Sequence, residues 1–247
     1  DVELAKQKAK EPTPPSSPKS PPPRPPATWE EKYNGLYDVL QHHLRKVNEH
    51  EVGTVAWKRA FKNYTLACCY LLEPEECRRL VYWNMAFDCG CEHGCMTCDG
   101  ENKNYISAIP DEKMEFVFYK HKSSAYHGTQ RREVAGKLKK VLRMYLDKCC
   151  DFQTTLFTDC SGNPFKSSNS FGTYLRRHVF SCYDKDLLRD DKSKNLGVQK
   201  LRKIVVNGCP EIAQRNAKLQ QLLDESEADA EKRGHTAMTE LIHYYLR

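Results

Sequence analysis

Apolar residues recur at helical spacing in the first third of the chain, where the pattern predicts three helices. In the segment 28–47 the apolar face is made of five large side chains: Tyr33, Leu36, Tyr37, Leu40 and Leu44. Thr28 is placed as the N-cap of this helix, and Glu31 is placed as the second member of a capping box. The same periodicity predicts a second helix over 54–72 and a third over 74–87.

The pattern then changes to short segments that are predicted as strands. Three such runs follow one another at 104–109, 114–119 and 129–134. Helical periodicity returns over 135–149, and a turn-rich connector follows it. Four more helices are predicted beyond the connector, at 170–180, 197–206, 210–232 and 233–247. Helices, then a small sheet, then helices again indicate one mainly helical α+β domain.

Proline marks the boundary of this domain. Residues 1–27 hold nine of the thirteen prolines of the chain. Proline removes backbone donors and favours extended geometry, and this segment has few apolar residues to bury. We therefore expect a disordered proline-rich linker over 1–27 and a folded domain over 28–247.

Charge and cysteine content narrow the class of protein. The formal net charge of +6 is compatible with a polyanionic partner. No apolar run approaches the roughly 18 residues of a membrane span, so no membrane association is expected. Twelve cysteines occur without a secretory signal pattern, which favours reduced thiols or a metal site in an intracellular protein. The pairs Cys68–Cys69 and Cys149–Cys150 fall on apolar helix faces and are expected in the core.

A cysteine-rich insert, "DCGCEHGCMTCDG", lies at 88–100. Its four cysteines are Cys89, Cys91, Cys95 and Cys98. The last two have the spacing of a zinc-ligand pair, the first two are closer than usual, and His93 is an alternative fourth ligand. The pattern predicts a structural zinc site. The alternative is a polar insertion loop with reduced thiols.

A third set of residues suits the cleavage of a phosphodiester. That reaction needs a nucleophile, cations that hold the non-bridging oxygens, and a proton donor for the leaving oxygen. The chain supplies candidates in this order: Arg78, Lys122, Gln199, Arg202, His235 and Tyr244. Taken singly, each also has an ordinary interpretation as a surface or core residue. The neighbours Arg79, Lys120 and Tyr245 are alternatives for the first, second and last of them.

This order resembles the catalytic domain of the tyrosine recombinase (phage integrase) family over about 60–247. That family has an arginine in an early helix, a lysine on a β-hairpin, an H-x-x-R helix, a G-H-[ST] step and a tyrosine nine residues after that histidine. Here "QKLR" ends at Arg202, "GHT" begins at Gly234, and Tyr244 has the family spacing. The resemblance implies a mainly helical α+β catalytic domain with a small three-stranded antiparallel sheet.

The resemblance also implies a mechanism. Tyr244 would attack the scissile phosphate and form a 3′-phosphotyrosyl link, and Lys122 would protonate the leaving oxygen. The phosphate would be held by four residues: Arg78, Gln199, Arg202 and His235. The reaction would need no cofactor. The partner would be DNA, the active form a homotetramer on two duplexes, and the location the nucleus or wherever the target DNA resides.

Three features depart from the family pattern. The early arginine lacks the family's G-L-R type of context, so that either Arg78 or Arg79 fits. Gln199 stands where the family usually has histidine, and glutamine donates a hydrogen bond but does not carry a proton as imidazole does. The helix predicted at 210–232 lengthens the gap between Arg202 and His235. Gln199 and the ambiguous first arginine favour the alternative of a catalytically inactive, recombinase-derived DNA-binding protein with a structural zinc site. A helical interaction domain without a DNA role is the third interpretation.

Overall fold

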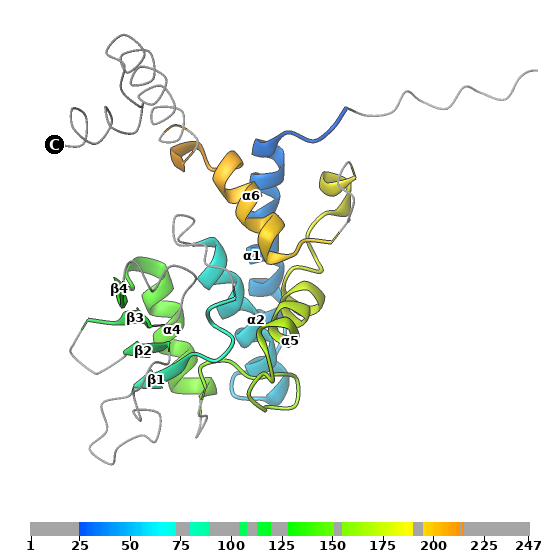
Figure 1. Cartoon of the computed structure of the whole chain (residues 1–247). Coiled ribbons are helices and arrows are strands. Elements are labelled where there is room, and N and C mark those ends of the chain that lie inside the picture. Colours follow the sequence, from blue (N-terminus) through cyan, green and yellow to red (C-terminus); the bar gives the residue numbers. More distant parts are fainter. Residues whose placement is uncertain are drawn as a thin grey trace, which may run out of the picture.

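The computed structural model describes residues 25–72, 80–88, 104–107, 113–119, 128–150, 155–189, 195–212 and 214. The helices are α1 (Trp29–Asn48), α2 (Val55–Leu71), α4 (Gly136–Cys149), α5 (Ser168–Tyr174) and α6 (Val198–Gly208), with a π-helical turn η2 (Leu175–Val179) and a 3₁₀ turn η3 (Lys185–Leu188). The strands are β1 (Ala86–Asp88), β2 (Tyr105–Ser107), β3 (Glu115–Phe118) and β4 (Gln130–Glu133). A mainly helical chain with a small sheet confirms the predicted mixed class (Figure 1).

Helices α1 and α2 form an antiparallel hairpin in the middle of the fold (Figure 1). The capping box predicted for α1 is present: Thr28 Oγ1 accepts from the Glu31 amide at 3.1 Å, and the Glu31 carboxylate accepts from the Thr28 amide at 2.7 Å. Thr54 caps α2 by accepting from the Trp57 amide at 3.2 Å. These caps satisfy amide groups that have no partner within the helices, which fixes where both helices begin.

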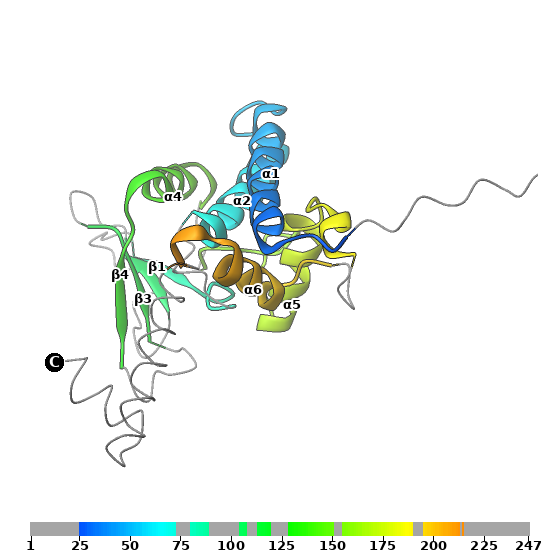
Figure 2. The ribbon, with the colours of Figure 1, turned by 90° about the horizontal axis from the view of Figure 1, so that it is seen from above.

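The sheet has the order β1-β2-β3-β4. Strands β2, β3 and β4 pair antiparallel, which confirms the three predicted strands. The fourth strand, β1, pairs parallel to β2 with Ala86 opposite Tyr105. Both views show the α1–α2 hairpin between the sheet with α4 on one side and α5 on the other (Figure 2).

Strand β1 corrects the third predicted helix. The prediction of a helix over 74–87 is wrong where the structure describes the segment, because residues 80–84 form turns and a strand follows. The amide of Ala86 donates to Asn104 O at 2.9 Å, and the amide of Leu156 donates to Met85 O at 2.6 Å. These bonds to distant parts of the chain outweigh a local helical pattern. Residues 73–79 lie outside the described ranges.

An aromatic cluster joins the hairpin, the sheet and η2. The ring of Tyr70 in α2 lies 5.4 Å from that of Tyr82 and 5.9 Å from that of Phe180, both edge-on. Tyr82 in turn contacts Phe116 of β3 at 5.5 Å. All four rings are buried. Edge-on contacts of this kind add to the stabilisation from buried area, so this cluster holds the sheet against the helices.

The two cysteine pairs belong to the same core. Cys68 and Cys69 of α2 and Cys149 and Cys150 at the end of α4 are buried and carry free thiols, as predicted. Burial raises the pKa of the Cys68 thiol to about 11. These thiols therefore act as small apolar side chains.

The later helices follow the prediction with one change. The predicted helix at 170–180 is α5 continued by η2, in which the Phe180 amide donates to Leu175 O at 2.8 Å, five residues back. The helix predicted at 197–206 is α6. Residues 210–212 and 214 are helical, and the rest of 210–247 lies outside the description, as does most of 1–27. None of the helices in the described ranges has the length and apolar character to cross a membrane.

Candidate functional site

Helix α6 positions Gln199 and Arg202. The helix forms here because four apolar residues at helical spacing are buried in the core: Val198, Leu201, Ile204 and Val205. Gln199 and Arg202 are three residues apart, so their side chains lie on one side of the helix, a single turn from each other. Gln199 is exposed and Arg202 is half-buried. Within the described part of the chain, neither side chain has a recorded hydrogen bond or ion pair.

Helix α6 is fixed against α1 by close packing at its other end. A Cβ added at Gly208 would meet the Trp29 carbonyl oxygen and lie 2.6 Å from the Tyr33 Cβ. Only glycine allows the two backbones to come this close. The Tyr33 hydroxyl is partly buried beside Cys209, and burial raises its pKa well above the usual value. This contact fixes the orientation of α6, and with it the orientation of the turn that carries Gln199 and Arg202.

A basic cavity lies against the start of α6. It has a volume of about 530 Å³, and its cationic lining residues are Arg176, Arg177 and Lys185. Asn195 and Leu196, which directly precede α6, also line it. The N-cap residue of α6 is Gly197, which has no side chain with which to cap the helix. Exposed cations beside a helix N-terminus form an environment that favours phosphate oxygens.

The sequence pattern does not indicate these three cations as a site. The signal was the "YLRRHVF" run, which places Arg176 and Arg177 at the end of a predicted helix. Nothing local links that run to Lys185 or to the start of α6. The neighbouring His178 has a lowered pKa, first because of partial burial and then because of the positive charge of Lys62 and Arg177. The ring is therefore mainly neutral at pH 7 and adds no charge to this surface.

The other predicted catalytic residues lie outside the described ranges. Arg78, with its alternative Arg79, is in the segment between α2 and β1. Lys122 and its alternative Lys120 are in the connection between β3 and β4. Because these two strands are antiparallel neighbours, the predicted hairpin is confirmed.

His235, Tyr244 and the alternative Tyr245 follow α6 and also lie outside the described ranges. Of the six predicted catalytic residues, the described structure therefore brings together Gln199 and Arg202.

The predicted zinc ligands also fall outside the description. Cys89, Cys91, Cys95 and Cys98, together with His93, belong to the segment between β1 and β2. Among the residues that are described, no group of three or more histidine, cysteine or acidic side chains is placed to hold a metal ion. The zinc site stays a prediction.

Comparison with family models, with curated proteins and with solved structures finds no match for this chain.

Proposed function

We propose that this protein breaks and rejoins DNA strands through a 3′-phosphotyrosyl intermediate, as tyrosine recombinases do. The observation that carries the proposal is the pair Gln199 and Arg202 on one turn of α6, without partners among the described residues. A guanidinium and an amide so placed suit the non-bridging oxygens of a phosphate. The antiparallel hairpin of β3 and β4, whose connection contains Lys122, supports the same interpretation.

The proposed reaction exchanges one phosphate ester for another. The phenolic oxygen of Tyr244 loses its proton to solvent as it attacks the scissile phosphorus, an oxygen–phosphorus bond to tyrosine forms, and the bond to the 5′ oxygen breaks. Lys122 gives a proton to that leaving oxygen. A 5′-hydroxyl of another strand then attacks the phosphotyrosyl link and restores the diester. Because the ester energy is kept, the cycle consumes no nucleotide cofactor.

Charge stabilisation in this scheme falls to residues around the phosphate. Arg202 and Arg78 hold the non-bridging oxygens, where negative charge builds up in the transition state. His235 and Gln199 donate further hydrogen bonds. Since Gln199 does not carry a proton, its role is confined to binding.

The basic cavity at the start of α6 supports DNA as the substrate. Its cationic lining residues are Arg176, Arg177 and Lys185. The segment that leads into the α6 turn with Gln199 also lines it. Positive side chains next to the reacting phosphate would neutralise neighbouring backbone phosphates and orient the duplex. Strand exchange between two duplexes requires several protomers, so we propose a homotetramer on DNA.

The second candidate function is DNA binding without catalysis, with a zinc ion held by the insert at 88–100. One observation favours it: an exposed glutamine, Gln199, at the position where the family has a proton-carrying histidine. A test must therefore separate chemistry from binding.

The test is covalent capture. The protein is incubated with a pool of randomised duplexes that each carry a nick, so that cleavage releases a short fragment and traps the enzyme on DNA. We expect an adduct that resists denaturation, and a phosphorylated peptide that contains Tyr244. Tyr244→Phe should abolish the adduct, while the matched control Tyr245→Phe should retain it.

Each result has one meaning. Loss of the adduct in Tyr245→Phe with its retention in Tyr244→Phe would reassign the nucleophile. Binding of the duplexes without any adduct would favour the non-catalytic DNA-binding function. Absence of both would overturn the DNA role.

A further inference from the structure

An exposed thiol and an imidazole meet where the turn after Thr158 lies against η2. The sulfur of Cys160 is 3.7 Å from Nε2 of His178, within hydrogen-bond reach of a sulfur atom. Both residues are exposed, so solvent and small molecules reach them. No step of the proposed DNA reaction uses either side chain. A thiol beside a base is suited to act as a nucleophile, because the base takes up the proton as the sulfur reacts.

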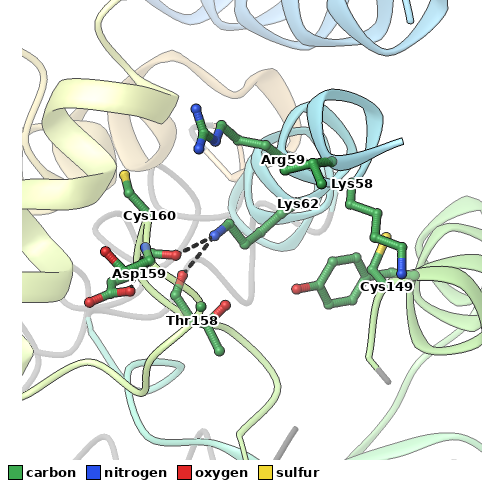
Figure 3. A pocket seen from close by; sticks show the side chains of 11 residues that line it. Lys58, Arg59, Lys62, Cys149, Thr158, Asp159 and Cys160 are labelled. Atoms are coloured by element: carbon green, nitrogen blue, oxygen red, sulfur yellow. Dashed lines mark hydrogen bonds between the residues drawn. The ribbon is translucent and has the colours of Figure 1, made fainter. Parts of the chain in front are cut away.

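The turn that carries Cys160 is held in place from two sides. The Asp159 carboxylate accepts hydrogen bonds from two amides of the same turn, at 2.8 Å and 3.0 Å. From α2, the buried Lys62 donates to the carbonyl oxygens of Thr158 and Asp159 at 2.9 Å and 2.8 Å (Figure 3). These residues line a cavity of about 250 Å³ between α2 and the turn. In Figure 3 the sulfur of Cys160 points away from Lys62, so the ammonium fixes the turn and leaves the thiol open.

The imidazole is positioned by an aromatic neighbour. The ring of His178 packs on that of Tyr174, one turn earlier, with 4.8 Å between the ring centres. Tyr174 is itself fixed, because its hydroxyl donates to Asn63 Oδ1 of α2 at 2.7 Å. The π-helical turn η2, a geometry that is frequent at functional sites, carries His178 past this ring. Nε2 therefore keeps a defined position beside the sulfur.

The protonation of the ring suits it to accept a proton. Partial burial lowers the pKa of His178, and three cations add to the shift: Lys62, Arg177 and Arg59. A ring that is mainly neutral at pH 7 has one nitrogen that accepts a hydrogen. Negative charge on Cys160 also interacts with Lys62, where it opposes the lowering of the lysine pKa by burial. The same attraction stabilises charge that develops on the sulfur during attack.

Cys182 shows what the other environment of a thiol looks like in this fold. Among the free cysteines in the described ranges, Cys160 is the exposed one. Cys182 also lies near an imidazole, 4.0 Å from Nε2 of His43. That nitrogen is already bonded to the carbonyl oxygen of Val179, so it is not free to accept the thiol proton. Burial raises the pKa of Cys182. Cys182 should therefore be inert, and it serves as an internal reference.

The surroundings of Cys160 favour a negatively charged reaction partner. Arg59 and Arg177 are exposed, and both act as positive charges on the His178 ring. Charges of this kind attract an approaching anion, and salt screens the attraction. An anionic disulfide is therefore expected to reach Cys160 more readily than a cationic one.

We propose that Cys160 is a modification site, at which a small anionic disulfide such as oxidised glutathione forms a mixed disulfide with His178 as the base. The thiol gives its proton to Nε2 while its sulfur attacks one sulfur of the small disulfide. A new sulfur–sulfur bond forms and the bond within the small molecule breaks. The leaving thiolate takes the proton from His178 and departs as a thiol. The small disulfide is the oxidant, so no further reactant is needed.

The test measures mixed-disulfide formation on the full chain. The protein is incubated with oxidised glutathione, the remaining thiols are alkylated, and peptide mass spectrometry gives the modified fraction at each site against time. At pH 7 we expect Cys160 to react at least about tenfold faster than Cys182. Equal rates at these two positions would overturn the proposal.

His178→Gln tests the base. Glutamine is polar and of similar size but takes up no proton, so the rate at Cys160 should fall by about tenfold or more at pH 7. His50→Gln, at an exposed position outside the cavity lining, is the matched control and should react as the wild type does. Circular dichroism checks that both variants are folded. A wild-type rate at Cys160 in His178→Gln would overturn the proposal.

The pH profile separates a base from a residue that only shapes the site. An unassisted thiol, with an ordinary pKa of about 8.5, loses about tenfold in thiolate for each pH unit below that value. The assisted pair reacts from a neutral thiol and a neutral imidazole, and both persist between about pH 6.5 and 7.5. The wild-type rate should change by less than about twofold over this interval, and that of His178→Gln by about tenfold. A tenfold change in the wild type would overturn the role of His178, and this measurement needs no variant to fold.

Cystamine, a cationic disulfide, tests the charge of the partner. Each rate at Cys160 is divided by the rate on the urea-unfolded chain, which removes the intrinsic difference between the reagents. Oxidised glutathione should then react faster than cystamine at low salt, and added salt should reduce the difference. Cystamine reacting as fast as glutathione would overturn the anionic class. No DNA is present in these experiments, so their failure would leave the proposed strand exchange standing.

Discussion

The imidazole Nε2 of His43 on α1 lies 2.7 Å from the carbonyl oxygen of Val179 in η2. Because a carbonyl only accepts, Nε2 carries the hydrogen. The ring is 4% exposed at the residue level, and burial is the main cause that lowers its pKa below 6.5, although the bond to Val179 opposes the shift. This neutral histidine links the first helix to the turn η2, which contributes Arg176 and Arg177 to the basic cavity.

His43 should make stability dependent on pH. The unfolded chain takes up a proton near pH 6.5 and the folded ring does so only at lower pH, so the stabilisation is complete above that value and falls as the pH drops below it. His43→Gln keeps an N–H donor but does not titrate. In urea unfolding at about pH 8 and about pH 5.5, the variant should lose less stability on acidification than the wild type. His50→Gln, at an exposed position, is the control, and an unchanged pH slope in His43→Gln would contradict the prediction.

Arg202→Ala should remove transition-state stabilisation with little effect on folding. Loss of one charge-stabilising donor typically lowers a rate by about 10²–10³. Arg202→Lys should recover only part of that, because an ammonium does not bind two phosphate oxygens as a guanidinium does. The measurement is the rate of adduct formation on nicked duplexes. If Arg202→Ala forms the adduct at the wild-type rate, α6 does not contribute to the catalytic site.

Gln199→His should raise the rate of adduct formation, since it restores an imidazole beside the phosphate. Gln199→Ala should lower the rate by about tenfold, in line with one lost neutral hydrogen bond. The side chain is exposed, so the free energy of unfolding of both variants should stay within about 0.5 kcal/mol of the wild type. Equal rates for histidine, glutamine and alanine would show that this position does not contact the substrate.

Gly208→Ala should destabilise the contact between α6 and α1. The added methyl would overlap the Trp29 carbonyl oxygen and the Tyr33 Cβ, and overpacking of this kind costs about 1–3 kcal/mol. That cost exceeds the roughly 0.5–1 kcal/mol that alanine gains over glycine within a helix. Gly172→Ala in α5 is the matched control, because its Cβ would lie at ordinary contact distance, 3.5 Å, from Leu80. Urea unfolding measures both, and equal stability would contradict the prediction.

The elements that the sequence predicted correctly depend on residues that are close together in the chain. Helix α1 follows from its apolar face and from Thr28 with Glu31, all within a few turns. Gln199 and Arg202 were placed on a helix for the same reason. The strand at Ala86–Asp88 was missed because its partners, Tyr105–Ser107, lie beyond a long insert, and pairing across such a distance leaves no local period.

The cavities were missed for a related reason. The spacing of Arg59 and Lys62 indicates one basic helix side, which most often faces solvent. Burial of Lys62 depends on the turn at Thr158, far along the chain. The turn itself was expected from its composition, but not its position against α2.

The packing of Gly208 on Trp29 and Tyr33 also sets an order of events during synthesis. The α1–α2 hairpin consists of neighbouring segments and leaves the ribosome early, whereas α6 is translated much later. Until α6 emerges, the start of α1 lacks its partner, and its aromatic side chains are available to chaperones or to other nascent chains. Among the helices that the structure describes, α6 is thus the last to be placed, and it carries the turn with Gln199 and Arg202 on which the proposed phosphate contact depends.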